Sequence, residues 1–291
     1  MSYIKVFIRA FLVMCFCANT FFSICHAQTA QLNIKSLQQK VALTFEQLNE
    51  QLKVRQQTYL NVHNDALKKV STHTLNQMRA NYSKELGMDV DLYIVNDDLV
   101  ITQTTFDNDL GLDFKSDSFR DAQTLFAAAK GSFRTLVTNP TLEISTQQYK
   151  IYTVSTLPSG GFLEIGFNDP EIAFFFNQAK AKLEAESSII STEVYLQYHG
   201  IQVSPLTITP AMTKHNREVL DKISYLEAVN NEVKKDLELF KPIKAGQLTI
   251  HKNNDFDGNY TMYLSLGNLS FIDDIDAFII CKLKLSSEPR A

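Results

Sequence analysis

The stretch DVDLYIVNDDLVITQTT at residues 89–105 decides the fold, because two strand-forming runs flank a short polar turn. β-Branched and aromatic residues on both sides of the acidic turn predict a β-hairpin. The hairpin is expected to begin a module that starts at residue 88.

The residues after the hairpin complete that sheet. A helix-like run from Phe119 to Lys130 ends at Gly131. Three strand candidates follow, SFRTLVT, QYKIYTVSTL and GFLEIGF, and a Pro-Ser-Gly-Gly turn separates the last two. Hairpin, helix and three strands predict a five-stranded antiparallel sheet with a helix on one face, over residues 88–170.

The same order of elements recurs after a connecting helix at residues 171–190. A second hairpin, VYLQYHGIQV, precedes a helix-like run at residues 210–239, and the strand candidates QLTIHK, YTMYLSLG and IDAFIICKLKL follow. We interpret residues 191–285 as a second copy of the first module, ahead of a polar tail at 286–291. The predicted fold class is α+β, with a long N-terminal helix and two modules, each a five-stranded antiparallel sheet with helix cover.

The long helix is predicted over residues 28–87. The chain from Gln28 to Leu86 contains neither glycine nor proline, and its apolar residues recur at steps of three and four. Two interpretations remain open at this stage. The segment is either an amphipathic helix with a break near Gln56-Gln57 or a coiled segment that forms a homodimer.

The first 27 residues have the composition of a signal peptide. Lys5 and Arg9 are their only charges, an apolar run follows, and Cys25-His26-Ala27 ends that run with small residues at both cleavage positions. We predict cleavage before residue 28 and a periplasmic mature protein. The alternative is an inner-membrane anchor formed by residues 6–25, a run that is short for a full span.

Composition excludes several functions. The net charge of −4 provides no basic face for nucleic acid. Three of the four cysteines lie in the leader, so the mature chain cannot form an internal disulfide or a cysteine-based metal site. The stretch Asn253–Gly258 matches the first half of a calcium loop, but Leu264 replaces the glutamate needed at the twelfth position. We expect neither a metal nor a cofactor.

The sequence resembles a known family of sensors. DLYIVNDDLVITQTTFDNDLGLDF and GFLEIGFNDPEI are similar to the hairpin and the closing strand of double Cache domains, PAS-like extracytoplasmic sensors of bacterial cyclases and chemoreceptors. The resemblance covers residues 31–285 and is strongest over 89–171, which corresponds to the membrane-distal module. It implies small-molecule sensing. The Gly-Gly-Asp-Glu-Phe signature of the cyclases is absent.

Six residues form the predicted ligand site between the helix at 119–130 and the sheet. The resemblance implies an arginine near this helix for a ligand carboxylate and a closing-strand aspartate for its amine. This chain departs from that pattern, since Asp121-Ala122 replaces a Trp-Tyr pair. The alternative is that the aspartate caps the helix beginning at Pro170. Tyrosine hydroxyls and aromatic walls would complete the site, which comprises Arg120, Tyr149, Tyr152, Asp169, Tyr93 and Phe126.

These observations lead to one preferred function and one alternative. We expect a sensing module that binds a small polar or zwitterionic ligand and signals through its long helix, a homodimer or a membrane sensor partner. No nucleophile elbow, phosphate loop or glycine-rich dinucleotide turn supports an enzyme. The alternative is a periplasmic structural or protein-interaction protein without a small ligand.

Overall fold

A computed structural model of the chain describes residues 2–116, 120–143, 148–198, 202–209, 212, 248–252, 260–265 and 277–286. The chain divides into two compact units, Met1–Thr44 and Phe45–Ala291. The first unit is the beginning of helix α1 (Ser2–Lys69), which continues into the second. Within the described part of the chain, no helix is long and apolar enough to cross a membrane.

The predicted long helix is two helices. α1 ends at Lys69 and α2 (Leu75–Leu86) begins after a short turn, so the interruption lies later than the expected break at Gln56-Gln57. A capping box explains its place, because the Thr74 side chain accepts from the Gln77 N–H while the Gln77 side chain accepts from the Thr74 N–H. Gly87 ends α2 with a φ of 67°, which glycine adopts without strain.

The first sheet has six strands rather than five. Its order is β2-β1-β6-β5-β3, with the short β4 also paired to β5. The hairpin predicted at residues 89–105 is present as β1 and β2, and all pairs are antiparallel. The strands are β1 (Asp89–Val95), β2 (Ile101–Thr104), β3 (Leu136–Val137), β4 (Thr141–Glu143), β5 (Gln148–Thr156) and β6 (Phe162–Asn168).

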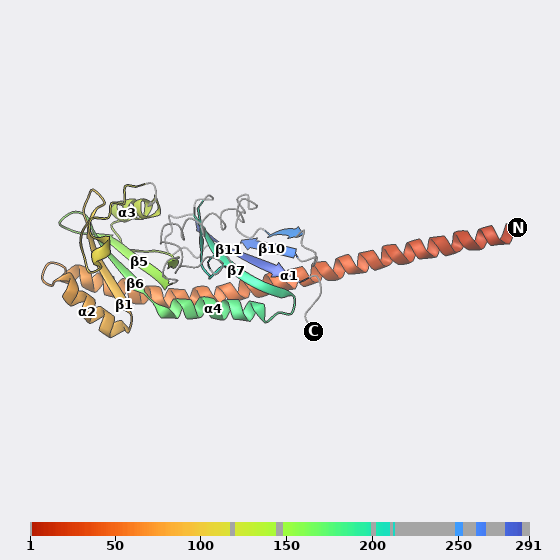
Figure 1. The fold of residues 1–291 in the computed structure, drawn as a ribbon, viewed down its shortest axis with the longest axis horizontal. Coiled ribbons are helices and arrows are strands. Elements are labelled where there is room, and N and C mark those ends of the chain that lie inside the picture. The colour runs from red at the N-terminus through yellow and green to blue at the C-terminus, as the bar shows by residue number, and fades with distance from the viewer. Residues whose placement is uncertain are drawn as a thin grey trace. The chain divides into compact units, whose positions relative to one another are not determined.

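Helices cover both faces of this sheet (Figure 1). α3 (Arg120–Ser132) lies on one face, where the rings of Phe126 and Phe162 are 4.9 Å apart. α1 lies on the other, where the rings of Tyr59 and Phe167 are 4.6 Å apart. A short 3-10 helix, η1 (Asp107–Asp109), follows β2. We call the two sides the α3 face and the α1 face.

The second sheet follows α4 (Pro170–Glu184) and has the predicted five antiparallel strands, in the order β8-β7-β11-β10-β9. The strands are β7 (Ile189–Tyr198), β8 (Gln202–Pro205), β9 (Leu248–Lys252), β10 (Tyr260–Ser265) and β11 (Ala277–Leu285). The predicted helix at 210–239, apart from Met212, and the half calcium loop at 253–258 lie outside the described residues. The predicted succession of a helix and two antiparallel sheets is confirmed.

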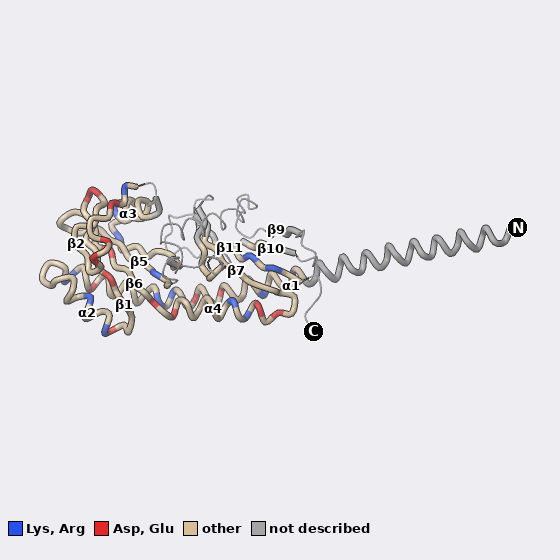
Figure 2. The backbone as a smooth tube through the Cα atoms, in the orientation of Figure 1, with Lys and Arg blue, Asp and Glu red and all other residues tan. Residues whose placement is uncertain are grey.

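Charge does not divide this fold into basic and acidic parts. Acidic and basic residues are mixed along α4, and acidic residues gather near β1 and β2 of the first sheet (Figure 2). One of these acidic side chains, Asp91 of β1, is only 3% exposed. A buried carboxylate is costly unless it is paired or hydrogen-bonded. The side chains around Asp91 are therefore the candidate functional site.

Candidate functional site

The first half of β1 has no partner strand on the β2 side, and side chains there supply polar groups around Asp91. β2 pairs with β1 only from Tyr93 onward, so the backbone at residues 90–92 needs other partners. The Arg79 guanidinium of α2 donates to the Val90 carbonyl at 3.2 Å and to the Thr105 carbonyl at 3.4 Å. Thr105 Oγ1 accepts from the amide of residue 92 at 2.9 Å. Arg79 is thereby fixed beside the Asp91 carboxylate.

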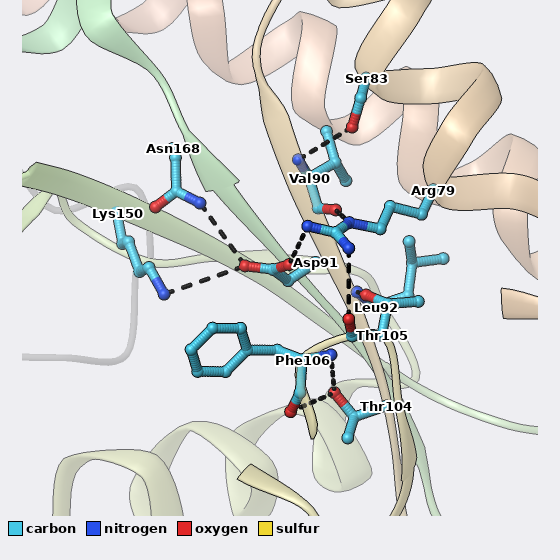
Figure 3. Close-up of polar contacts among 10 residues, drawn as sticks. All are labelled: Arg79, Ser83, Val90, Asp91, Leu92, Thr104, Thr105, Phe106, Lys150 and Asn168. Carbon is cyan, nitrogen blue, oxygen red and sulfur yellow. Dashed lines mark hydrogen bonds and ion pairs between the residues drawn. The ribbon is translucent and has the colours of Figure 1, made fainter. Parts of the chain in front are cut away.

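Asp91 lies between two cations and an amide on the α3 face (Figure 3). Its Oδ1 is 3.5 Å from Arg79 Nη2, and its Oδ2 is 3.9 Å from Lys150 Nζ. Asn168 Nδ2 donates to Oδ2 at 3.5 Å. The Lys150 ammonium also lies 5.4 Å from the centre of the Phe106 ring. These distances are long for charge-assisted hydrogen bonds, which are typically ~2.7–2.9 Å.

Two buried oxygens of this group accept no hydrogen bond among the described residues, although Arg79 Nη2 forms an ion pair of 3.5 Å with the first of them. They are Asp91 Oδ1 and Asn168 Oδ1. Desolvation by burial raises the pKa of Asp91, although Lys150 and Arg79 oppose the shift. Buried polar groups in native proteins are normally satisfied, so each unsatisfied oxygen needs an explanation. A bound group that carries N–H donors would supply one.

Glu164 adds a second buried acid to the same face. Its side chain is 6% exposed. Desolvation by burial raises its pKa to about 8, with a further increase from Asp109 and an opposing effect from Lys150. Glu164 is therefore mostly neutral at pH 7, and a cation placed beside it would favour its ionised form.

Tyr93 and Tyr152 lie on the same face of the sheet as Asp91 and Glu164. Burial raises the pKa of Tyr93, with smaller increases from Asp91, Tyr152, Asp109 and Glu164. Its hydroxyl is therefore electrostatically coupled to all four. The name α3-face site is used below for Asp91, Tyr93, Lys150, Tyr152, Glu164 and Asn168.

Gly166 shapes the floor of the α3-face site. It pairs with Asp91 on one side and with Tyr152 on the other. A Cβ atom at Gly166 would lie 3.1 Å from the Tyr152 ring and 3.7 Å from the Tyr93 ring. A side chain at this position would therefore press on the Tyr152 ring, while its contact with the Tyr93 ring would be an ordinary one.

A cleft reaches the edge of the site. It has a volume of about 500 Å³ and opens where β1 and β5 begin and β6 ends, with Asp89, Gln148 and Asn168 among its lining residues. Asn168 also donates to Asp91, so it belongs to both the cleft and the site. No group of three or more metal-ligating side chains occurs among the described residues.

The structure brings together three of the six residues predicted from the sequence. Tyr93, Tyr152 and Phe126 lie on the α3 face, as the strand registers and the Phe126–Phe162 contact show. α3 begins at Arg120, but the side chain of Arg120 lies outside the described part of the structure. Ligand binding by these residues stays a prediction.

The other two predicted residues lie on the α1 face. Tyr149 stacks on Phe176 of α4 at 5.3 Å and donates a hydrogen bond to the Leu206 carbonyl. Asp169 caps α4 by accepting from the Glu171 N–H at 2.9 Å, which is the alternative role considered for it. Tyr149 and Tyr152 lie three residues apart on β5 and therefore point to opposite faces, so the structure does not bring Tyr149 and Asp169 together with Tyr152.

Asp169 is neutralised within the chain. Its Oδ2 accepts from Arg55 Nε at 2.7 Å and from the Tyr59 hydroxyl at 2.6 Å, and both partners belong to α1. The carboxylate raises the pKa of Tyr59, after the larger effect of burial. His63 continues this polar strip, with hydrogen bonds of 2.7 Å to the hydroxyls of Thr153 and Ser155. The strip attaches α1 to the sheet.

Sequence reasoning missed four residues of the α3-face site. They are Asp91, Lys150, Glu164 and Asn168. The signal was the alternation along each strand, which places polar residues at every second position of DVDLY and QYKIY and puts Glu164 and Asn168 on one face of FLEIGFN. The polar residues that share one face of these three strands include the four missed residues, together with Tyr93 and Tyr152.

Comparisons with known proteins concern the fold alone. No family model matches the chain, and no curated protein does so by sequence. Solved structures that resemble it include the ligand-binding domain of the Campylobacter jejuni chemoreceptor Tlp3 with L-valine. That match has 9% identity, covers 87% of this chain and 94% of that one, and has a TM-score of 0.41.

Two Pseudomonas domains are similar at the same level. The ligand-binding domain of the P. fluorescens chemoreceptor CtaA with L-alanine has 12% identity, covers 83% of this chain and 92% of that one, and has a TM-score of 0.45. The P. aeruginosa chemoreceptor PctC domain with GABA has 10% identity, coverage of 86% and 98%, and a TM-score of 0.45. Similarity at this level does not transfer a ligand to this chain.

Proposed function

We propose that the first module is an extracytoplasmic sensor that binds a small amine-bearing molecule in the α3-face site, without catalysing a reaction. One observation carries the proposal. The buried Asp91 carboxylate and the half-buried Asn168 amide each keep a buried oxygen that accepts no hydrogen bond from the described residues, on the face of the sheet that α3 covers. An ammonium group offers three N–H donors and a positive charge, which suits unsatisfied acceptors better than a neutral or anionic group does.

The charges of the site determine which charged groups a ligand can carry. Asp91 provides the negative pole, and Glu164 becomes a second one when it loses its proton. Lys150 is 13% exposed, lies 3.9 Å from the Asp91 carboxylate and opposes the raised pKa of Glu164, so a ligand carboxylate could approach its ammonium while the amine contacts the acids. A zwitterion such as an α-amino acid therefore fits the site as well as a simple amine.

Binding should depend on pH because Glu164 titrates near neutrality. A cation beside Glu164 lowers its pKa, so binding releases a proton whenever the free site is protonated. With a pKa of about 8 in the free chain, affinity should rise as the pH increases from 6 to 8. A ligand that contacts only Asp91 would show no such increase over this range.

The test is a thermal-shift screen of the purified protein with amines and amino acids. A specific ligand raises the melting temperature in a concentration-dependent way. Asp91→Asn should weaken binding about ten- to a hundredfold, because a charged hydrogen-bond partner is worth ~1.5–3 kcal/mol. Asp107→Asn, at an exposed position in η1, is the matched control and should keep the wild-type shift.

Two results would overturn this function. One is a screen in which no amine or amino acid shifts the wild-type protein. The other is a ligand that binds Asp91→Asn as tightly as it binds the wild type. Export is tested separately by mass spectrometry of protein from the periplasmic fraction, where an N-terminus at Gln28 is expected. Recovery of intact Met1 from the membrane fraction would favour an anchored protein that signals through a partner.

A further inference from the structure

The second sheet repeats part of the α3-face site, namely its acid and its two tyrosines. In the first sheet, β1 carries the sequence acid–aliphatic–tyrosine at Asp91–Tyr93, and in the second, β7 carries the same sequence at Glu193–Tyr195. The N–H of the middle residue donates to a threonine hydroxyl at 2.9 Å in both, namely Thr105 and Thr207. The two acids therefore occupy equivalent positions.

The registers extend the equivalence across three strands. Asp91 lies opposite Gly166 on β6, which lies opposite Tyr152 on β5. The same row in the second sheet is formed by acid, lysine and tyrosine, namely Glu193, Lys282 and Tyr263. Acid and tyrosine recur, and one position differs. A glycine in the first sheet corresponds to a lysine in the second.

Lys282 completes the second site from within the chain. Its ammonium is 3.1 Å from Glu193 Oε1, and the Tyr195 hydroxyl donates to Oε2 of the same carboxylate. The side chains of Glu193 and Lys282 are 9% and 15% exposed. The carboxylate of the second sheet thus has a close ammonium and a hydroxyl donor, whereas the cations beside Asp91 lie at 3.5 and 3.9 Å and its Oδ1 accepts no hydrogen bond from the described residues.

We propose that Lys282 is the built-in occupant of an amine site on the second sheet, and that shortening this side chain opens the site to small primary alkylammonium ions. The class of group follows from what already fills the position, a primary ammonium on a four-carbon chain. The inference shares with the proposed function only the idea that this row of side chains accepts an ammonium. It also explains why one module of the pair would sense a ligand while the other stays in its filled state.

The test shortens Lys282 to alanine and adds a free alkylammonium ion that matches the removed part of the side chain. Lys282→Ala retains Cβ, and n-propylammonium provides the three further carbons and the ammonium. Breaking a buried pair leaves Glu193 without its cation, so the melting temperature of Lys282→Ala should fall by roughly 10 °C. Tens of millimolar n-propylammonium chloride should restore at least half of that loss, by binding the folded state only.

Three controls define what counts as rescue. n-Propanol should not restore stability, because it lacks the charge. Lys282→Met should not respond to the amine, because its side chain fills the space. Lys284→Ala, on the same face of β11, should respond no more than the wild type does. Equal shifts for Lys282→Ala and Lys284→Ala, or no shift for either, would overturn the proposal.

Two further measurements separate this inference from the first module and from a failure to fold. The rescue is repeated in an Asp91→Asn background, where binding at the α3-face site is impaired and rescue at Glu193 should persist. If Lys282→Ala does not fold alone, it is refolded from urea with n-propylammonium chloride or with sodium chloride. Recovery of the native circular dichroism signal only with the amine supports the site, and equal recovery in both salts refutes it.

Discussion

Glu164→Gln should stabilise the protein, and the gain should grow with pH. Glu164 is buried, and its pKa is raised to about 8 from an ordinary value of 4.5. The folded state therefore holds a proton that the unfolded state releases, so this group lowers stability as the pH rises from 4.5 to 8. Linkage gives a cost of about 1 kcal/mol at pH 5 and about 3 kcal/mol at pH 7. Glutamine keeps the shape of the side chain and removes the charge.

The pH dependence is more informative than the absolute gain. A buried amide without partners has its own penalty of ~1–3 kcal/mol, but that penalty is the same at every pH. The advantage of Glu164→Gln over the wild type should therefore increase by about 2.5 kcal/mol between pH 5 and pH 7. For a unit of this size that corresponds to roughly 5–10 °C in melting temperature.

Urea unfolding followed by circular dichroism at pH 5, 6, 7 and 8 measures this difference. Glu46→Gln, at an exposed position on α1, is the control and should follow the wild type. A Glu164→Gln variant whose stability runs parallel to the wild type across this range would refute the burial argument. It would also remove the basis for a rise in ligand affinity between pH 6 and 8.

Two other predictions concern the polar strip between α1 and the sheet. Burial lowers the pKa of His63 to about 3, so the folded state needs the neutral imidazole and stability is lost as the pH falls below 6.5. The loss in unfolding free energy should be about 2 kcal/mol at pH 5. His63→Gln should abolish this loss in the same urea series. A pH profile unchanged by His63→Gln would contradict the assignment. Asp169→Ala should cost ~3 kcal/mol, the lower end for a broken buried pair, because Arg55 keeps an ion pair of 3.3 Å with the exposed Glu171. The same change removes the cap of α4 and the acceptor of the Tyr59 hydroxyl, and it should leave ligand affinity intact. Loss of ligand binding at constant stability would instead return Asp169 to the binding site.

The opposing slopes of Glu164 and His63 have a joint consequence. Between pH 5 and pH 7, Glu164 lowers stability by about 2.5 kcal/mol while His63 raises it by about 2 kcal/mol. The wild type should therefore change little over this range, although each single variant should show a steep dependence. A pH-independent stability of the wild type would not reveal either ionisation, so Glu164→Gln and His63→Gln must be measured together.

The sequence predicted the order of elements better than the contents of the site. The hairpin at residues 89–105 and the repeat after residue 190 follow from local signals, since strand formers and turn residues alternate at short range. The break between α1 and α2 was misplaced because a capping box at Thr74 decides it, and the apolar period alone does not reveal a cap. β4 was missed because three residues provide too short a pattern.

The site was harder because its residues come from strands distant in sequence. Tyr149 and Tyr152 were grouped by proximity in the chain, yet the register places them on opposite faces of β5. Lys150 lies between them in sequence and belongs with Tyr152 on the α3 face, where it approaches Asp91 of a different strand. Alternation assigns a side chain to a face, but only the strand order decides which acid it meets. The order β1-β6-β5 places β6 between them, with Gly166 in the row of Asp91 where the second sheet has Lys282 beside Glu193.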